Sequence, residues 1–241
     1  MSQPIKMCTD KILSPAQEQR ALKKSIGHNP ANGEPGGKLA AISRWLWRPG
    51  TVLTVGFMGG DPIVQRKIEE IAHEWSQYAN ITFKFGQHRK ANIRIAFDKN
   101  DGSWSHLGTC ALAIFRNRPT MNYGWLEPNT ADDEYQRVVL HEFGHALGCI
   151  HEHQHPEAGI PWNKEAVYAY YAKRGWSRSD VDNNLFAHYA KDQTQFSLYD
   201  PESIMHYPID PELTIGGYSV GWNRHLDDSD KTFIAVLYPH D

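Results

Sequence analysis

Residues 141 to 152 read His141-Glu142-Phe143-Gly144-His145-Ala146-Leu147-Gly148-Cys149-Ile150-His151-Glu152. Apolar residues lead into this stretch and predict a buried helix. On a helix, residues four apart share a face, so His141 and His145 can direct their imidazoles at one metal ion. His151 can join them only if the helix stops first, and Gly148 stands where glycine can take the left-handed C-cap conformation. Three imidazoles and one open position are the ligand set of a catalytic zinc, which predicts one zinc ion per chain.

This spacing, H-E-x-x-H-x-x-G-x-x-H, resembles the signature of the metzincin zinc proteases. Glu152, directly after the third histidine, narrows the resemblance to the astacin family. A second segment, Ser203-Ile204-Met205-His206-Tyr207, is similar to the astacin Met-turn. The resemblance implies that Met205 lies beneath the metal and that Tyr207 approaches it as a ligand and catalytic residue. It covers the chain from about residue 45 to 239 and is similar in particular to the compact microbial members.

The order of the expected elements predicts an α+β fold, because strands and two helices come first and a loop-rich half follows. Taken with the resemblance, this α+β order predicts a metzincin-like domain of two lobes. The first lobe holds a twisted mixed sheet and two long helices. The second lobe is loop-rich and contains the Met-turn and a terminal helix. We expect strands at 51–57, 81–85, 93–97, 112–115 and 121–126. We expect helices at 62–78, from 132 onward, and at 163–173, 180–189 and 227–237.

Residues 1–40 are rich in turn-forming residues and are interpreted as a leader and linker outside the core; whether they form a pro-segment is left open. Residues 41–241 form the predicted catalytic domain, with the upper lobe ending at about 151 and the lower lobe at 152–241.

Composition excludes several classes of protein. The 241 residues carry a formal net charge of -3, with acidic and basic residues interspersed, so we expect neither nucleic-acid binding nor an anionic membrane surface as partner. No apolar run approaches the roughly 18 residues of a membrane helix, so we expect no membrane insertion. The first 30 residues lack the apolar core of a secretory signal. The expected location is therefore the cytosol, or the exterior by a leaderless route or after removal of a signal.

The three cysteines, Cys8, Cys110 and Cys149, are a poor disulfide framework. Familiar secreted astacins carry two disulfides, and in the segment that matches one of them this chain has Ser103 in place of the cysteine. The sequence leaves open whether Cys110 and Cys149 are bridged, and Cys149 is expected to pack as a small apolar residue.

The predicted reaction is hydrolysis of peptide bonds in protein or peptide substrates by a zinc-activated water. Glu142 would accept the proton of that water as general base, and the resemblance implies that the Tyr207 hydroxyl stabilises the carbonyl oxygen. A zinc-binding module without protease activity is one alternative, although such a module has no need of Glu142. The second alternative is another class of zinc hydrolase that contains H-E-x-x-H. Enzymes of that class lack a glycine and a third histidine at the positions that Gly148 and His151 occupy here.

The leader contains Cys8-Thr9-Asp10, and pro-segments of the resembled family supply a side chain to the zinc. Cys8 as a thiolate, or Asp10 as a carboxylate, is therefore a candidate latency ligand. Glu152 fits this idea, since in astacins it pairs with the new N-terminal amine after the leader is cut. The competing interpretation is an unstructured tail with an incidental cysteine. His153 and His155 are expected in surface or supporting roles, and the segment 155–162 departs from the family pattern, so a cleavage preference is not transferred.

Overall fold

The computed structural model describes residues 6–9, 11, 13–33, 43–86, 90–187 and 198–240. Within them, five strands form one mixed sheet in the order β2-β1-β3-β5-β4. Four of these strands are parallel, and β4 pairs antiparallel with β5 at one edge. The strands are β1 Thr51–Phe57, β2 Ile81–Phe85, β3 Ile93–Ala96, β4 Trp104–Ser105 and β5 Met121–Asn122.

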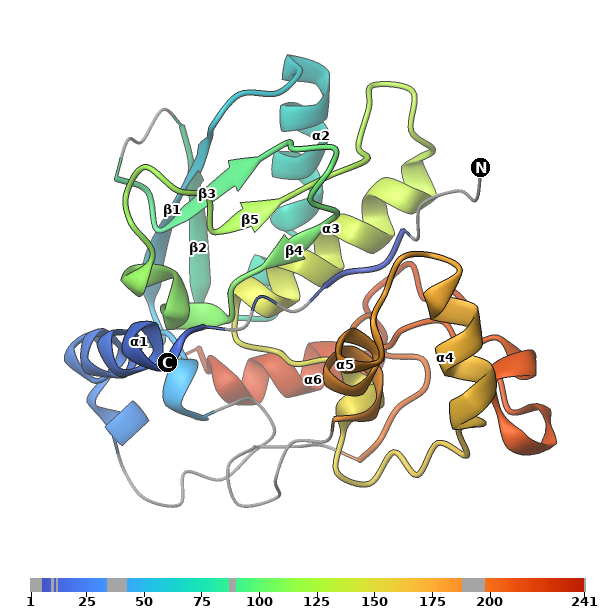
Figure 1. The fold of residues 1–241 in the computed structure, drawn as a ribbon. Helices are drawn as coiled ribbons and strands as arrows, with labels where there is room; N and C mark the ends of the chain where they lie inside the picture. Colours follow the sequence, from blue (N-terminus) through green and yellow to red (C-terminus); the bar gives the residue numbers. More distant parts are fainter. Residues whose placement is uncertain are drawn as a thin grey trace.

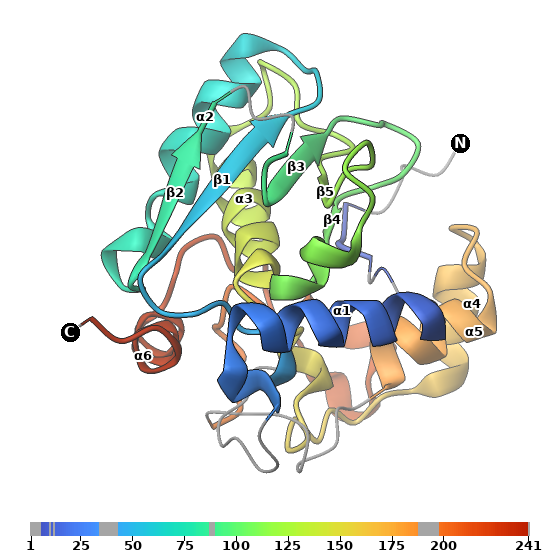
Figure 2. The same ribbon diagram turned by 90° about the vertical axis from the view of Figure 1, so that its left-hand side faces the viewer.

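Two helices, α2 (Pro62–Ala72) and α3 (Asp132–Ala146), pack side by side against one face of this sheet (Figures 1 and 2). Asp61 caps α2 by accepting from the Ile63 amide at 2.7 Å, as the sequence predicts. The predicted helix at 62–78 ends earlier, at Ala72, and a short 3-10 turn at Trp75–Gln77 follows. The main core fills the space between sheet and helices, with Leu53, Val55, Ile68, Phe83, Ile95, Val139, Leu140 and Phe143 among its buried side chains.

The second half of the chain has fewer regular elements, and it lies below the sheet in Figure 1. Asn163 caps α4 (Lys164–Ala172) and Ser177 caps α5 (Arg178–Val181), which continues as a π turn, Asp182–Phe186. Asp227 caps the terminal helix α6 (Asp228–Leu237) in a capping box. Short 3-10 turns complete this half, at Glu152–Gln154, Pro211–Leu213 and Ile215–Gly217. The α+β arrangement is therefore confirmed. The predicted helix at 180–189 ends earlier, at Phe186, since Ala187 is extended, and residues 188 and 189 lie outside the described part of the chain.

The predicted strand at 112–115 is wrong, because the chain forms a 3-10 helix at Gly108–Ala113 instead. Gly108 has φ +41°, and a Cβ there would lie 1.9 Å from the Trp45 carbonyl oxygen. The Lys24 ammonium donates to the Leu112 carbonyl at 2.6 Å. These contacts come from distant parts of the chain, so the apolar pattern of 112–115 does not reveal them. The predicted strand at 121–126 is also shorter, ending at Asn122.

The leader contains a helix that the sequence analysis did not predict, α1 (Pro15–His28). Its local signal is a capping box of Ser14 and Gln17 with Pro15 at the first helical position. The helix packs on the Gly108–Ala113 turn (Figure 2), where Ser25 Oγ and Thr109 Oγ1 are buried and 2.6 Å apart. Short 3-10 turns follow at Pro30–Gly33 and Ser43–Trp45. This part of the leader is therefore packed against the domain rather than lying outside the core.

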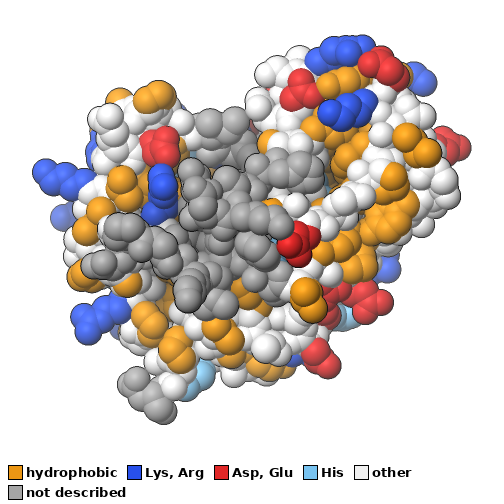
Figure 3. Space-filling view, turned by 90° about the horizontal axis from the view of Figure 1, so that it is seen from below, with side chains coloured by type: hydrophobic (Ala, Val, Ile, Leu, Met, Phe, Trp, Pro, Cys, Tyr) orange, Lys and Arg blue, Asp and Glu red, His pale blue; other side chains and the backbone are white. Residues whose placement is uncertain are grey.

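None of the described helices combines the length and apolar character that a bilayer span requires. On the lower face, lysine and arginine side chains are scattered among acidic and apolar ones (Figure 3).

Candidate metal centre and catalytic site

Two histidines on α3 hold their rings in fixed orientations. His141 Nδ1 donates to the Ile204 carbonyl and His145 Nδ1 to the Cys149 carbonyl, each at 2.8 Å. A carbonyl can only accept, so both rings carry their proton on Nδ1 and present the Nε2 lone pair to the same side. Burial, followed by the neighbouring His145 and His151, lowers the pKa of His141 well below its ordinary value. The neutral imidazole is the form that binds a metal.

The C-terminus of α3 brings His151 back to these rings. Gly148 has φ +102°, and the Cys149 amide donates to the Gly144 carbonyl at 3.0 Å, so the chain reverses immediately after the helix. Two carbonyls at the helix end accept from side chains, Ala146 from the Trp47 indole at 2.8 Å and Leu147 from the Tyr238 hydroxyl. His151 Nε2 then lies 3.1 Å from His145 Nε2.

The donor set of this cluster fits a zinc ion. The ligand atoms of Cys8, His141, His145 and His151 all lie within 4.8 Å of one another, and all four residues are buried. Among the described residues, no hydrogen-bond partner reaches the buried Nε2 of His141. A buried imidazole nitrogen without a partner costs free energy unless something binds it. Imidazole nitrogens and a thiolate are the ligand types that zinc prefers.

Glu142 lies next to the cluster without belonging to it. Its side chain is fully buried, and Oε2 accepts from the Cys8 thiol at 3.4 Å. The Glu142 carboxylate therefore lies beside the histidine cluster. The neighbouring residue on the helix, His141, contributes one of the four ligand atoms of that cluster. The Glu142 carboxylate is not among the four ligand atoms of the cluster.

The segment Ser203–Tyr207 packs against α3 from the lower lobe. A Cβ on Gly144 would lie 2.4 Å from Met205 Sδ, so the methionine contacts the helix at Gly144, between His141 and His145. The Met205 carbonyl accepts from the Glu152 amide at 3.0 Å. Asp230 fixes the start of the turn, since its carboxylate accepts from Ser203 Oγ at 2.7 Å and from the Ile204 amide at 2.8 Å.

Tyr207 lies between rings of the site. Its ring centroid is 4.3 Å from that of His151 and 4.2 Å from that of His153, with the second pair stacked. Its hydroxyl donates to the Cys8 carbonyl at 2.5 Å. The hydroxyl therefore contacts a peptide carbonyl of the leader next to the histidine cluster.

A family model for astacin, described as a peptidase family, matches residues 46–211. The chain belongs to the astacin family of zinc metalloendopeptidases. Two myroilysin structures resemble this astacin. One is 53% identical with a TM-score of 0.82 and covers 84% of this chain and 99% of its own. The other is 47% identical with a TM-score of 0.65 and covers 97% of this chain and 100% of its own.

Two more distant proteins are also similar to this chain. Zinc metalloproteinase nas-27 of Caenorhabditis elegans is 24% identical over 151 residues, which make up 61% of this chain and only 30% of that relative's length. A hatching enzyme zinc-protease of the medaka fish Oryzias latipes is 20% identical, with a TM-score of 0.54, and covers 85% of this chain and 95% of its own. At that identity the hatching enzyme shows a shared fold.

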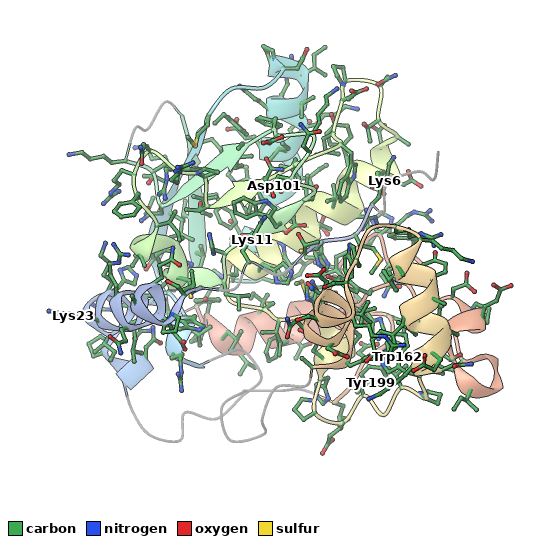
Figure 4. The ribbon with its side chains drawn as sticks, viewed as in Figure 1. Lys6, Lys11, Lys23, Asp101, Trp162 and Tyr199 are labelled. Atoms are coloured by element: carbon green, nitrogen blue, oxygen red, sulfur yellow. The ribbon has the colours of Figure 1, made fainter. Side chains whose placement is uncertain are left out.

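The leader of this astacin runs through the candidate site. Residues 6–9 pass between the upper and lower lobes (Figure 1), and Cys8 forms a parallel bridge with Ser103 beside β4. Farther along, Lys11 pairs with Asp101 at 2.7 Å (Figure 4). The structure thus places Cys8 among the histidines, whereas Asp10 lies outside the described residues. Cys110 and Cys149 are both buried and form no disulfide with each other.

Glu152 lies partly buried beside the Met-turn. Its Oε1 accepts from the Asp200 amide at 3.0 Å, and burial raises the pKa of this carboxyl to about 8. Asp230 and Ser203 line the same small cavity. The resemblance implied that Glu152 receives an N-terminal amine, and this role stays a prediction.

Sequence reasoning missed the burial of two further histidines. His153 and His155 are both buried, where surface or supporting roles were expected. His153 Nε2 donates to the Asn184 carbonyl at 2.7 Å, which holds its ring against Tyr207. The local pattern carries no signal for this, because Asn184 lies 31 residues away on a different element.

Proposed function

We propose that this astacin is a zinc endopeptidase in which His141, His145 and His151 hold one zinc ion and Glu142 acts as general base. The observation that carries the proposal is the convergence of three buried imidazole nitrogens beside a buried carboxylate that is not among the four ligand atoms. The substrates are proteins or peptides, as membership of a peptidase family implies.

A zinc ion in this cluster supplies a Lewis acid that lowers the pKa of a bound water toward about 7. Glu142 accepts the proton of the attacking water and later delivers it to the leaving amine. The Tyr207 hydroxyl donates a hydrogen bond to the carbonyl oxygen as negative charge develops there, as it donates to the Cys8 carbonyl in this structure. The buried rings of His151 and His153 keep the tyrosine ring in place.

The chain with its leader in place is proposed to be latent, with Cys8 as the fourth ligand. Its thiol lies among the histidines and contacts Glu142, so the leader occupies both the open metal position and the base. Asp10, the carboxylate alternative, is retained as a proposal without a structural account.

The proposal is tested by casein digestion with and without a chelator, alongside Glu142→Gln. The variant should keep its zinc and its thermal unfolding midpoint but lose nearly all turnover, because it removes proton transfer and leaves the three ligands. Asp132→Asn, which changes an exposed carboxylate on the same helix, is the matched control for loss of an acidic side chain. Retained activity in Glu142→Gln would reject the hydrolytic mechanism, and activity that survives zinc removal would reject the metal. A zinc-loaded wild type without turnover, also when Cys8 is replaced, would favour the non-proteolytic alternative.

A further inference from the structure

The leader segment 6–9 is bound as an extended peptide, by contacts to its backbone. The Arg137 guanidinium donates to the Lys6 carbonyl at 3.1 Å, and the Ser103 carbonyl accepts from the Thr9 amide at 3.2 Å. Between these contacts, Tyr207 binds the Cys8 carbonyl. Backbone contacts of this kind recognise any extended chain, so the same groups can hold a substrate.

Met7, next to Cys8, places its side chain in what we call the Met7 pocket. It is 7% exposed and belongs to a buried cluster with Val167, Tyr171, Val181, Leu185, Tyr207 and Leu213. The Tyr171 hydroxyl donates to Met7 Sδ at 3.5 Å. Val167 and Tyr171 lie four residues apart on α4 and therefore face the pocket together.

The cluster is built of apolar and aromatic side chains together with the Cys8 thiol. Arg174, two residues after the end of α4, lines the same cavity as Met7, but its guanidinium donates to the Tyr170 carbonyl at 2.9 Å and lies over the Tyr170 ring. Arg137 is held by Glu134 at 2.7 and 2.8 Å. A charged side chain in the Met7 pocket would lose its hydration among apolar and aromatic side chains, which is costly. The pocket therefore favours an apolar side chain.

The direction of the leader indicates which substrate residue enters the pocket. The leader runs parallel to the edge strand at Ser103. A substrate that runs antiparallel gains the more stable pairing and presents its peptide groups in the reverse order. Compared with such a substrate, the leader runs through the site in the opposite direction. Its peptide bonds are therefore not aligned for cleavage, as expected for a segment that occupies the site uncut. In the antiparallel direction, the residue after the scissile bond lies on the Met7 side.

Resting on the proposed function, we propose that the Met7 pocket selects a medium-sized apolar residue, such as Met or Leu, directly after the scissile bond. Tyr171 is the residue that sets the depth of this pocket.

The cleavage test uses the full-length chain with Met7→Gly and Cys8→Ser, which empties the pocket and removes the thiol. Peptides that differ only after the scissile bond should show a kcat/KM at least tenfold higher for Met or Leu than for Asp. Adding Tyr171→Ala should improve Phe relative to Leu severalfold, and Tyr171→Phe should leave that ratio unchanged. Glu165→Ala, at an exposed position on the same helix, is the control. The proposal would be overturned by an equal kcat/KM for Asp and Met peptides, or by selectivity for the residue before the scissile bond instead of after it. An unchanged ratio of Phe to Leu cleavage in Tyr171→Ala would also overturn it.

A second measurement does not depend on turnover. In the full-length chain, Met7→Asp should weaken docking of the leader and increase the rate of Cys8 alkylation severalfold, while Met7→Leu should leave the rate unchanged. Peptide mass spectrometry separates Cys8 from Cys110 and Cys149. If no variant cuts any peptide, the proposed function fails. The alkylation rates still test whether the Met7 pocket prefers an apolar side chain. Equal rates for Met7→Asp and Met7→Leu would overturn it.

Discussion

The Cys8 thiol donates to Glu142 Oε2 at 3.4 Å, although the two residues are 134 positions apart in the sequence. The same thiol lies with the three histidines, so one leader side chain contacts both the candidate metal ligands and the candidate base. A substrate cannot reach either group while this contact persists.

Cys8→Ser in the full-length chain should therefore raise activity severalfold, because a serine hydroxyl is a much weaker zinc ligand than a thiolate. Activity on casein is measured with zinc-loaded protein. Cys110→Ser, at a buried thiol packed against Ala21 and Trp45, is the matched control and should not activate. Asp10→Asn tests the carboxylate alternative. If all of these match the wild type, latency through the leader is wrong and the protease assignment is unaffected.

His145→Ala and His151→Ala should each lose most of the bound zinc, since two imidazoles rarely hold a catalytic zinc tightly. The measurement is zinc per chain after gel filtration in a weak chelator. His73→Ala, at the C-cap of α2, removes a histidine away from the cluster and should retain one zinc per chain. Full zinc in either ligand variant would contradict the assignment.

Tyr207→Phe should reduce kcat on the order of ten- to a hundredfold, because one hydrogen-bond donor to the oxyanion is lost while zinc remains. The ring stays stacked on His153, so the unfolding temperature should change little. KM distinguishes a role in substrate binding from a role in the transition state. It should stay within about twofold when only the transition-state contact is removed. An unchanged kcat would exclude the oxyanion role.

Gly144→Ala should destabilise the fold by about 1 to 3 kcal/mol, since the new methyl group would overlap Met205 Sδ. Urea unfolding measures this change. Gly27→Ala in α1 is the control, because nothing lies within 4 Å of its added Cβ and alanine favours the helix. A neutral Gly144→Ala would show that Met205 does not pack against α3.

Asp230→Asn should flatten the dependence of stability on pH. Burial raises the pKa of Asp230 to about 7 from an ordinary value of 3.8, so the folded state holds this proton more tightly than the unfolded chain. Its contribution is complete below about pH 4 and is lost as the pH rises to about 7, by an amount on the order of 4 kcal/mol at most. The free energy of unfolding is compared between pH 4 and 7, with exposed Asp228→Asn as control. Equal slopes in wild type and Asp230→Asn would refute this.

The sequence by itself determined the parts of the site that depend on neighbours along the chain. The spacing of His141 and His145 follows from the period of a helix, and the turn at Gly148 follows from the conformations open to glycine. The β-rich strand at 51–57 and the capped helix α6 were also predictable, because their signals lie in residues that are close together in the sequence.

Only the tertiary structure decided what the leader does at the site and which side chains surround it. The contact of Cys8 with Glu142, the insertion of Met7 beside Tyr171 and the burial of His153 join residues far apart in sequence. The 3-10 turn at Gly108–Ala113 replaced a predicted strand because α1 and Trp45 pack against it. A local pattern states which face of a segment is apolar, but not which distant segment covers that face, because that choice depends on how the whole chain packs.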